Sequence, residues 1–476
     1  MVVQHNMQAA NANRMLNVTT SAQSKSTEKL SSGYKINRAA DDAAGLTISE
    51  KMRKQIKGLD RASTNAEDGV SAVQTAEGAL TEVHSMLQRM NELATQSANG
   101  TNSNTDRKAI QDEIDQLTTE IDRVSETTKF NETYLLKGDG AEKEHNVNAH
   151  DAGLDGVKLT DKGDSVEVVL KELKGGDKIS IAGKNYTIGA ETADVTQLFT
   201  DANVTDEANK KVTIDGTEYT YYDKAVGGDT LTNKGFYVNQ PAAADKATAT
   251  AAYGSITDIA ALKGVTISAG GKSVTTMGTA TDGVDNKDSS VITAKKAYML
   301  ETAEVLKASG IGADKAATAT GNDALATATN KFTLTKGKVN YNDALSFNLH
   351  VGADADMTNK ITVNIDSMNS AGLGVKGIKA DTEQDATYAI DAIADAISTV
   401  SSQRSALGAV QNRLEHTINN LDNVVDNTTS AESRIRDTDM AEEMVNYSKN
   451  NILAQAGQSM LAQANQSNQG VLSLLQ

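Results

Sequence analysis

Residues 388–427 read YAIDAIADAISTVSSQRSALGAVQNRLEHTINNLDNVVDN and carry the strongest structural signal in the chain. Alternating steps of three and four residues from Ile390 reach an apolar side chain at nine of the eleven positions up to Val425, which is the heptad pattern of a coiled coil. The two polar positions, Arg404 and Gln411, either fix the register of this seam or lie beside it where the seam rotates towards Val410. One helix over this range would be about 60 Å long and needs an apolar partner.

The partner for this helix lies near the beginning of the chain. Residues 110–124 repeat the same alternating steps, a looser apolar stripe runs from Met52 to Met90, and a polar turn at residues 99–102 separates the two. We therefore expect two early helices to pair with the late one, so that residues from about 140 to 380 leave a helical rod and return to it. The expected core positions of the rod are Ile110, Ile114, Leu117, Ile121, Val124, Ile393, Ile397, Val400, Leu407, Leu414, Ile418 and Leu421.

The residues between these helices have a different composition, which predicts β-structure. All eleven arginines lie before Val124 or after Gln403, whereas eleven of the seventeen aromatic residues lie between residues 139 and 346. Residues 179–187, 212–220 and 265–275 each alternate apolar and polar side chains around a glycine turn, as β-hairpins do. One helix is expected at about residues 294–308. The middle of the chain is therefore predicted to form one or two small β-rich subdomains.

The two ends of the chain, residues 1–40 and 435–476, are polar but carry apolar residues at helical spacing. If such a pair of helices buried ~1000 Å² of apolar surface, it would gain ~25 kcal/mol, whereas ordering about 80 residues costs ~1 kcal/mol or more each. We therefore expect the ends to become ordered only when neighbouring subunits cover them; the alternative is a pair of disordered tails. The apolar residues expected to make these contacts are Met444, Ile452, Leu453, Leu461, Val471, Leu474 and Leu475.

The composition argues against several classes of function. The chain has no Cys, which excludes disulfides, thiolate metal sites and cysteine nucleophiles. Its net charge of −17 repels phosphate groups and anionic lipids, so neither a nucleic acid nor a membrane is expected as a partner. No apolar run approaches the ~18 residues of a membrane span, and residues 1–10 lack the apolar core of a cleavable secretory signal.

Motifs that would support catalysis or cofactor binding are also missing. The sequence contains no HExxH, GxSxG or GxxxxGK[ST] pattern. Residues 372–377 match GxGxxG, but the long heptad helix follows them, so we interpret them as a glycine-rich turn. His145 and His150 lie among acidic residues at 139–151, where a solvated loop is more plausible than a metal site. We expect no enzyme activity, no cofactor and no metal.

Both ends of the chain resemble the bacterial flagellin family. The similarity is carried by residues 30–46, LSSGYKINRAADDAAGL, and by residues 433–444, SRIRDTDMAEEM. It continues in ILAQAG at 452–457 and MLAQANQ at 460–466, and it covers about residues 1–136 and 347–476. Residues 347–373 are similar to a β segment of this family. Tyr34 stands where the family usually has Leu.

The resemblance implies a multi-domain fold with all-α coiled-coil terminal and inner domains, whose N- and C-terminal helices pair, and an inserted β-rich outer region. The implied domains are a terminal helical domain (1–40 and 435–476), an inner helical rod with a β segment (41–138 and 347–434), and a variable surface-exposed insertion (139–346). It further implies a secreted, extracellular subunit that polymerises with itself into the flagellar filament. The alternative is another axial protein of the flagellum, such as the hook–filament junction protein.

The resemblance also implies partners other than the chain itself. Export would use the flagellar type III route with an uncleaved N-terminal signal, and an export chaperone would hold the C-terminal helix. Filament cap and hook-junction proteins would meet the ends of the polymer. A host Toll-like receptor would bind the early helices, where Arg89, Leu93 and Glu113 match the family's contact residues. Asn91 stands where the family often has Arg, which bears on the strength of that contact.

Overall fold

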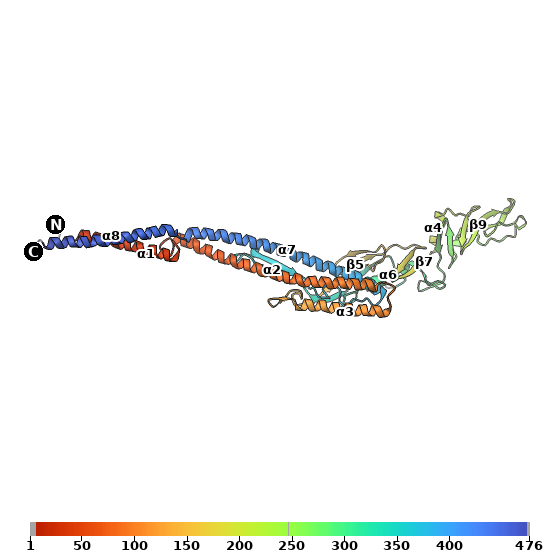
Figure 1. Ribbon diagram of the computed structural model, residues 1–476. Coiled ribbons are helices and arrows are strands. Elements are labelled where there is room, and N and C mark those ends of the chain that lie inside the picture. Colours follow the sequence, from red (N-terminus) through yellow and green to blue (C-terminus); the bar gives the residue numbers. More distant parts are fainter. Residues whose placement is uncertain (1–5, 246, 323, 474–476) are drawn as a thin grey trace. The chain divides into compact units, whose positions relative to one another are not determined.

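The structure is a computed structural model that describes residues 6–245, 247–322 and 324–473 (Figure 1). The chain forms two compact units, which we describe one at a time. The first comprises Met1–Val73, Phe347–Val363 and Gly408–Gln476, and the second comprises Gln74–Ser346 and Asn364–Leu407. Two long helices, α2 (Ala43–Ser97) and α7 (Glu383–Arg436), contribute a segment to each unit. All-α terminal parts with an inserted β-rich region are the predicted fold class, which is confirmed.

In the first unit, α1 (Met7–Ser32) lies alongside α8 (Met440–Ser473), as Figure 1 shows. The side chain of Asn6 caps the start of α1 by accepting from the Ala9 amide at 3.0 Å. The helix ends at Gly33, whose φ of +75° is the left-handed conformation that glycine adopts without strain. The chain then pairs briefly with the end of α7, since the Lys35 amide donates to the Arg436 carbonyl at 2.8 Å.

Tyr34 has a clear role at this junction. It forms a β-bridge with Asp437, and the guanidinium of Arg436 lies 4.7 Å from the centre of its ring. A cation over an aromatic face is attracted by the ring's quadrupole, which a leucine at this position would not provide. Tyr34 therefore contributes a contact between the N-terminal and C-terminal segments.

The remainder of the first unit is an antiparallel pair formed by the start of α2 and the end of α7. Ser63 donates to Asp422 at 3.1 Å, and Arg436 forms an ion pair with Glu50 at 2.9 Å, so the two helices run in opposite directions. The strands β19 (Leu345–His350) and β20 (Lys360–Ile365), joined by the short helix η2 (Met357–Asn359), form a two-stranded sheet. The core contains Ala66, Val351, Ile361 and Leu414.

The second unit contains the end of α2, the start of α7 and a third helix, α3 (Asn104–Thr127). Helix α3 begins at a capping box made by Ser103 and Asp106. Each of the three helices contributes fully buried apolar side chains, among them Leu80, Leu87, Ile114, Ile121 and Ile393. A small hairpin, β1 (Lys129–Phe130) and β2 (Thr133–Tyr134), follows α3. Both early helices and the late helix are present as the periodicity predicts.

The chain enters and leaves the β-rich region through a single two-stranded ribbon. Strand β3 (Glu142–Asn146) pairs antiparallel with β18 (Lys338–Asn342). Just before the ribbon, the Asp139 amide donates to the Asp343 carbonyl at 3.0 Å, and the Asn342 side chain donates to the Lys137 carbonyl at 2.8 Å. The outgoing and returning segments are therefore joined side by side.

Three larger sheets make up the rest of this region. The first sheet has the spatial order β16 (Thr318–Thr320), β17 (Lys331–Thr335), β5 (Ser165–Val169) and β4 (Lys158–Asp161). The second has the order β13 (Ala280–Thr281), β14 (Val284–Asp285), β15 (Val291–Ile292), β7 (Lys184–Ile188) and β6 (Lys178–Ile181). The third has the order β10 (Thr230–Tyr237), β9 (Thr217–Lys224), β8 (Lys211–Ile214), β11 (Thr266–Ala269) and β12 (Lys272–Thr275). The helices among them are α4 (Thr192–Asp201), η1 (Ala243–Asp245), α5 (Ile256–Ala260) and α6 (Ala294–Ala308).

The local predictions for this region are confirmed. The three expected hairpins are β6–β7, β8–β9 and β11–β12, and the expected helix is α6 with the same bounds. The interpretation of residues 139–151 as a solvated loop is wrong for its first half. Strand β3 occupies residues 142–146, and the ring of His145 stacks on Tyr341 at 3.9 Å. Its partner strand lies almost 200 residues later, so local sequence gave no sign of it.

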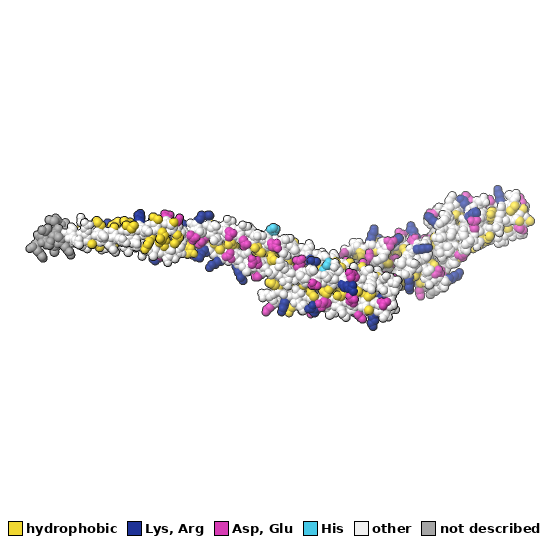
Figure 2. Space-filling view, viewed as in Figure 1, with side chains coloured by type: hydrophobic (Ala, Val, Ile, Leu, Met, Phe, Trp, Pro, Cys, Tyr) yellow, Lys and Arg dark blue, Asp and Glu magenta, His cyan; other side chains and the backbone are white. Residues whose placement is uncertain are grey.

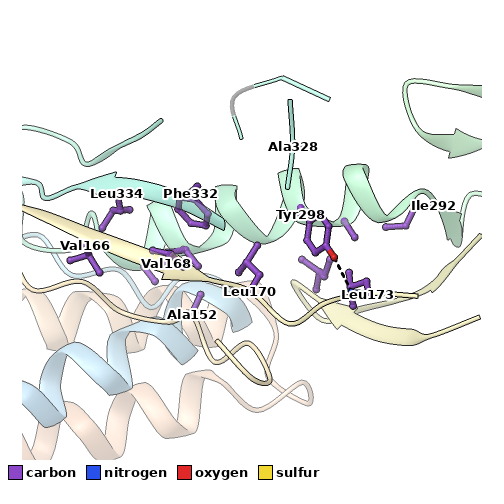
Figure 3. Close-up of a cluster of buried hydrophobic side chains, with 14 of the residues drawn as sticks. Ala152, Val166, Val168, Leu170, Leu173, Ile292, Tyr298, Ala328, Phe332 and Leu334 are labelled. Carbon is purple, nitrogen blue, oxygen red and sulfur yellow. Dashed lines mark hydrogen bonds between the residues drawn. The ribbon is translucent and has the colours of Figure 1, made fainter. Parts of the chain in front are cut away.

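Helix α6 lies at the centre of the larger core of the β-rich region (Figure 3). The hydroxyl of Tyr298 points from α6 towards Leu173 and accepts from its amide at 2.9 Å. The same helix buries two carboxyl groups. Glu304 accepts from the Tyr388 hydroxyl at 2.6 Å and from Lys307 at 2.9 Å. Glu301 is also buried, and among the described residues no donor reaches its Oε2.

Burial therefore raises the pKa of Glu301 to about 7, with Lys171 acting weakly in the opposite direction. The phenol of Tyr388 is shifted as well. Burial, followed by the hydrogen bond to Glu304, raises the pKa of Tyr388 well above its usual value. The phenol therefore stays protonated and keeps donating to the Glu304 carboxylate, which anchors α6 to the first turns of α7.

Candidate assembly and recognition surfaces

The heptad seam of the rod is buried over most of its length. Among the expected core positions, Leu117, Val124, Ile397 and Ile418 are half-buried. The others are buried, namely Ile110, Ile114, Ile121, Ile393, Val400, Leu407, Leu414 and Leu421. Large-to-small changes at the buried positions would leave cavities, whereas the half-buried ones lie at the edge of the seam.

The polar positions of the seam have partners. Arg404 is half-buried and forms an ion pair with Glu77 of α2 at 3.7 Å. Its neighbour Gln403 is buried instead and donates to the carbonyl of Asn364 in β20 at 3.0 Å. The seam has therefore rotated by one residue at this point. Gln411 bonds Glu415 on its own helix at 2.9 Å while Val410 packs in the core, which agrees with rotation rather than with a buried polar register position.

Helices α1 and α8 carry apolar residues that this chain leaves uncovered. Met444, Ile452 and Leu453 are exposed on α8, and Leu461 is half-buried. A groove of about 760 Å³ runs between the two helices and includes Leu16, Leu453 and Met460 among its lining residues. Figure 2 shows hydrophobic side chains gathered over these helices. Of the expected contact residues, the side chain of Val471 and all of Leu474 and Leu475 lie outside the described residues.

The expected receptor residues lie on α2 and α3. Arg89 donates to Glu113 across the two helices at 2.9 Å and also to Glu92 at 3.2 Å, and all three side chains are largely exposed. The hydrogen bond to Glu113 is the main reason that the pKa of Arg89 is raised. Leu93 differs from the expectation of an exposed contact, because it is only 2 % exposed. Its side chain is therefore buried, whereas the ion pair of Arg89 with Glu113 is exposed.

Two buried polar residues of α3 support the surface that carries Arg89 and Glu113. The spacing of apolar residues in the sequence did not predict them. Arg107 donates to three backbone carbonyls of the α2–α3 turn: Ser97 at 2.9 Å, Asn99 at 2.9 Å and Asn102 at 3.1 Å. Gln111 donates to the carbonyl of Ile378 at 3.0 Å. One further step of three residues back from Ile110 reaches Arg107, so extending the heptad would have marked it as a seam position.

Replacing Arg107 by methionine is expected to lower the free energy of unfolding by about 2 kcal/mol, because carbonyls at the end of α2 lose a charged donor. Denaturant unfolding followed by circular dichroism measures this change. Arg123→Met is the matched control, since Arg123 is exposed and, among the described residues, its hydrogen bonds go to Glu120 on its own helix. Equal stability of the two variants would contradict the role given to Arg107.

The described residues contain neither a grouped set of metal ligands nor a helix that could span a membrane. Across residues 6–245, 247–322 and 324–473, no three His, Asp or Glu side chains are grouped so that they could hold a metal ion. Within the same ranges, none of the helices combines the length and the apolar character that crossing a bilayer requires. The chemistry that the described surfaces offer is apolar contact along α1 and α8, and paired charges along α2 and α3.

Comparison with known proteins places these features in a family. Residues 3–141 match the bacterial flagellin N-terminal helical region, and residues 390–475 match the bacterial flagellin C-terminal helical region. A flagellin of Clostridium tyrobutyricum is 40% identical over 474 residues, which cover 98% of this chain and 100% of that protein. Flagellin C of Vibrio cholerae is 34% identical and covers 99% of each chain.

Solved structures add little to this result. FliC from Burkholderia pseudomallei is 18% identical, covers 72% of this chain and 99% of its own, and superposes with a TM-score of 0.25. Flagellar hook associated protein-3 from Legionella pneumophila is 12% identical, covers 81% and 98%, and has a TM-score of 0.32. These scores are too low to carry an argument. The family models and the full-length relatives do carry one: the chain belongs to the flagellin family, whose members are structural subunits of the extracellular bacterial flagellar filament.

Proposed function

We propose that this chain polymerises through α1 and α8, which pack against the same helices of neighbouring copies. The observation that carries the proposal is the set of exposed apolar residues on α8, Met444, Ile452 and Leu453, together with the groove between α1 and α8 that Leu453 helps to line. A single copy leaves them in water, whereas a lattice of copies covers them from several sides. Many weak contacts then add up to a stable polymer.

Seeded assembly tests this proposal directly. Purified chain is added to short filament seeds, and growth is followed by light scattering and negative-stain electron microscopy. A filament subunit elongates the seeds to lengths set by its concentration. The alternative, a hook–filament junction protein, would add a short cap and stop, so failure to elongate would favour that function.

We propose that the polymer is layered according to the three domains expected from the sequence. Residues 1–40 and 435–476 form the innermost layer, residues 41–138 and 347–434 form the wall, and residues 139–346 face the solvent. Support for this assignment comes from the apolar α1–α8 surfaces and from the exit ribbon β3–β18, through which the insertion leaves the rod as a unit. Limited proteolysis of filaments should then cleave within 139–346 before the other two layers.

We further propose export through the flagellar type III route, with a chaperone on α8 before export, and contact with filament cap and hook-junction proteins at the polymer's ends. The chain has no Cys and a single proline, Pro241, so neither disulfides nor multiple slow proline isomerisations oppose unfolding for passage. The exposed apolar residues of α8 supply a surface that a chaperone would cover. Loss of the chain from the culture medium of an export-deficient strain tests the route.

We propose Arg89 and Glu113 as contacts for a host Toll-like receptor, because they form an exposed pair of opposite charges on adjacent helices. Leu93 would support this surface from beneath. Arg89→Ala is expected to lower receptor-reporter activation about tenfold, the effect of removing a typical interface hot spot. Activation is measured with monomeric protein on receptor-expressing cells.

The exchange variant Arg89→Glu with Glu113→Arg is the matched control for this prediction. It keeps an ion pair within the chain but reverses the charges that a partner meets. Both Arg89→Ala and the exchange variant should lose receptor activation if the receptor binds the charged groups of Arg89 and Glu113. If the exchange variant restores activation, the pair serves only the packing of α2 against α3.

A further inference from the structure

Most of the exposed methionines among the described residues lie on the terminal helices α1 and α8. The sequence contains 13 methionines and no Cys, so thioethers are its only sulfur groups. Five methionines on α1 and α8 are exposed: Met7, Met15, Met440, Met444 and Met460. By contrast, Met90 in the rod and Met368 are completely buried. The apolar surface proposed for assembly therefore carries most of the exposed methionines among the described residues.

Two of these methionines belong to the groove between α1 and α8. Met15 of α1 is 59% exposed and Met460 of α8 is 61% exposed, and both line the groove of about 760 Å³. Gly457 lies between the helices, where a side chain would contact Leu16 at 3.4 Å, so the helices approach closely beside an open apolar channel. A small oxidant can enter this channel in a free subunit.

Hydrogen peroxide converts a methionine thioether into a sulfoxide. A lone pair of the sulfur attacks one peroxide oxygen, the O–O bond breaks, an S–O bond forms, and the other oxygen leaves as water after proton transfer. The sulfur loses two electrons and the peroxide gains them. The product is a polar and chiral side chain in place of a flexible apolar one, and methionine sulfoxide reductases reverse the change.

We propose that the exposed methionines of α1 and α8, led by Met15 and Met460, are a reversible oxidation site through which peroxide blocks polymerisation of free subunits. This inference rests on the proposed role of α1 and α8 in assembly. A sulfoxide carries a strong hydrogen-bond acceptor, and packing it against an apolar neighbour removes water from that acceptor without replacing the lost bond. Met90 and Met368, which are completely buried, are shielded from the oxidant.

The test compares the full-length chain before and after exposure of the monomer to hydrogen peroxide. Peptide mass spectrometry reports which methionines carry an added oxygen, and seeded growth reports the critical concentration. We expect sulfoxides at Met15 and Met460 before Met90 and Met368, a critical concentration raised at least about tenfold, and unchanged helicity by circular dichroism. Treatment with methionine sulfoxide reductases A and B should restore growth.

Two variants localise the effect. One replaces all five exposed methionines of α1 and α8 by leucine, and the ratio of its critical concentrations with and without peroxide should be close to one. The other is Met357→Leu, which removes a methionine that is 72% exposed but lies in η2; it should stay as sensitive as the parent chain.

The outcomes separate this inference from the proposed function. Growth of the oxidised parent chain at the untreated critical concentration, with sulfoxides present at Met15 and Met460, would overturn the oxidation site while leaving assembly intact. Failure of reductase treatment to restore growth would also overturn it. If untreated chain does not elongate seeds, the assembly role itself fails. Rescue by the reductases keeps the test decisive even if the five-leucine variant assembles poorly.

Discussion

A chain that ends at Met444 should fail completely to form filaments while its α2–α7 pair stays folded. Removing Val445–Gln476 deletes most of α8 and takes away Ile452, Leu453 and Met460, which lie on the proposed assembly surface. The contacts that hold α2 against α7 are outside this segment, including Ser63 with Asp422 and the buried Leu414. Electron microscopy measures assembly, and thermal unfolding by circular dichroism measures the rod.

The matched control for this truncation is a larger deletion elsewhere. The five-stranded sheet β10-β9-β8-β11-β12 lies within residues 191–275. The residues that flank this segment, Ala190 and Thr276, form a parallel β-bridge, so the chain can be rejoined where the segment is removed. Deletion of residues 191–275 is expected to leave filaments that grow. Filaments formed by the α8 truncation, or lost in the control deletion, would contradict the assignment of assembly to the terminal helices.

The second prediction with a large expected effect concerns the stability contributed by the buried carboxyl group of Glu301 in α6. Because the folded pKa of Glu301 is raised to about 7 from an ordinary 4.5, its contribution to stability is fully present below about pH 4.5 and is lost as the pH rises through 7. Glu301→Gln should therefore stabilise the β-rich region at pH 8 by up to about 3 kcal/mol and change little at pH 4. Calorimetry of the full chain at the two pH values measures this difference.

An exposed glutamate provides the control for this pH dependence. Glu172 lies in the same region but in solvent, so Glu172→Gln should shift the transition by the same small amount at both pH values. A Glu301→Gln transition that moves equally at pH 4 and pH 8 would show that the folded carboxyl titrates normally. The position of the carboxyl among the strands around α6 would then need another explanation.

Much of the fold follows from short-range patterns. The rod helices, the hairpins β6–β7 and β8–β9, and the bounds of α6 depend on periodicity over ten to fifty residues, which the sequence displays directly. The sheets depend on pairings between distant segments. Strand β15 lies parallel to β7 about a hundred residues earlier, and β8 pairs with β11 some fifty residues later. No local pattern encodes these partners, because many strands of similar apolar character compete for each edge.

The functional surfaces show the same division. The apolar residues of α8 can be predicted from the sequence, because helical spacing places them on a face, whereas Arg89 and Glu113 are indicated only by the resemblance to the flagellin family. The burial of Leu93 and the three carbonyl contacts of Arg107 depend on how α2, α3 and their turn come together. Glu301 is similar, since its raised pKa arises from strands that pack over α6 from elsewhere in the chain.

The ribbon formed by β3 and β18 has a consequence for how this chain can diversify. Because the departing and returning strands are bonded to each other, the helical part meets the same two anchored ends whatever is inserted between them. The entropy of closing a loop grows only with the logarithm of its length, so a longer or shorter insert would add little penalty. The sequence between β3 and β18 can therefore change during evolution while its two connections to the helical part remain the same.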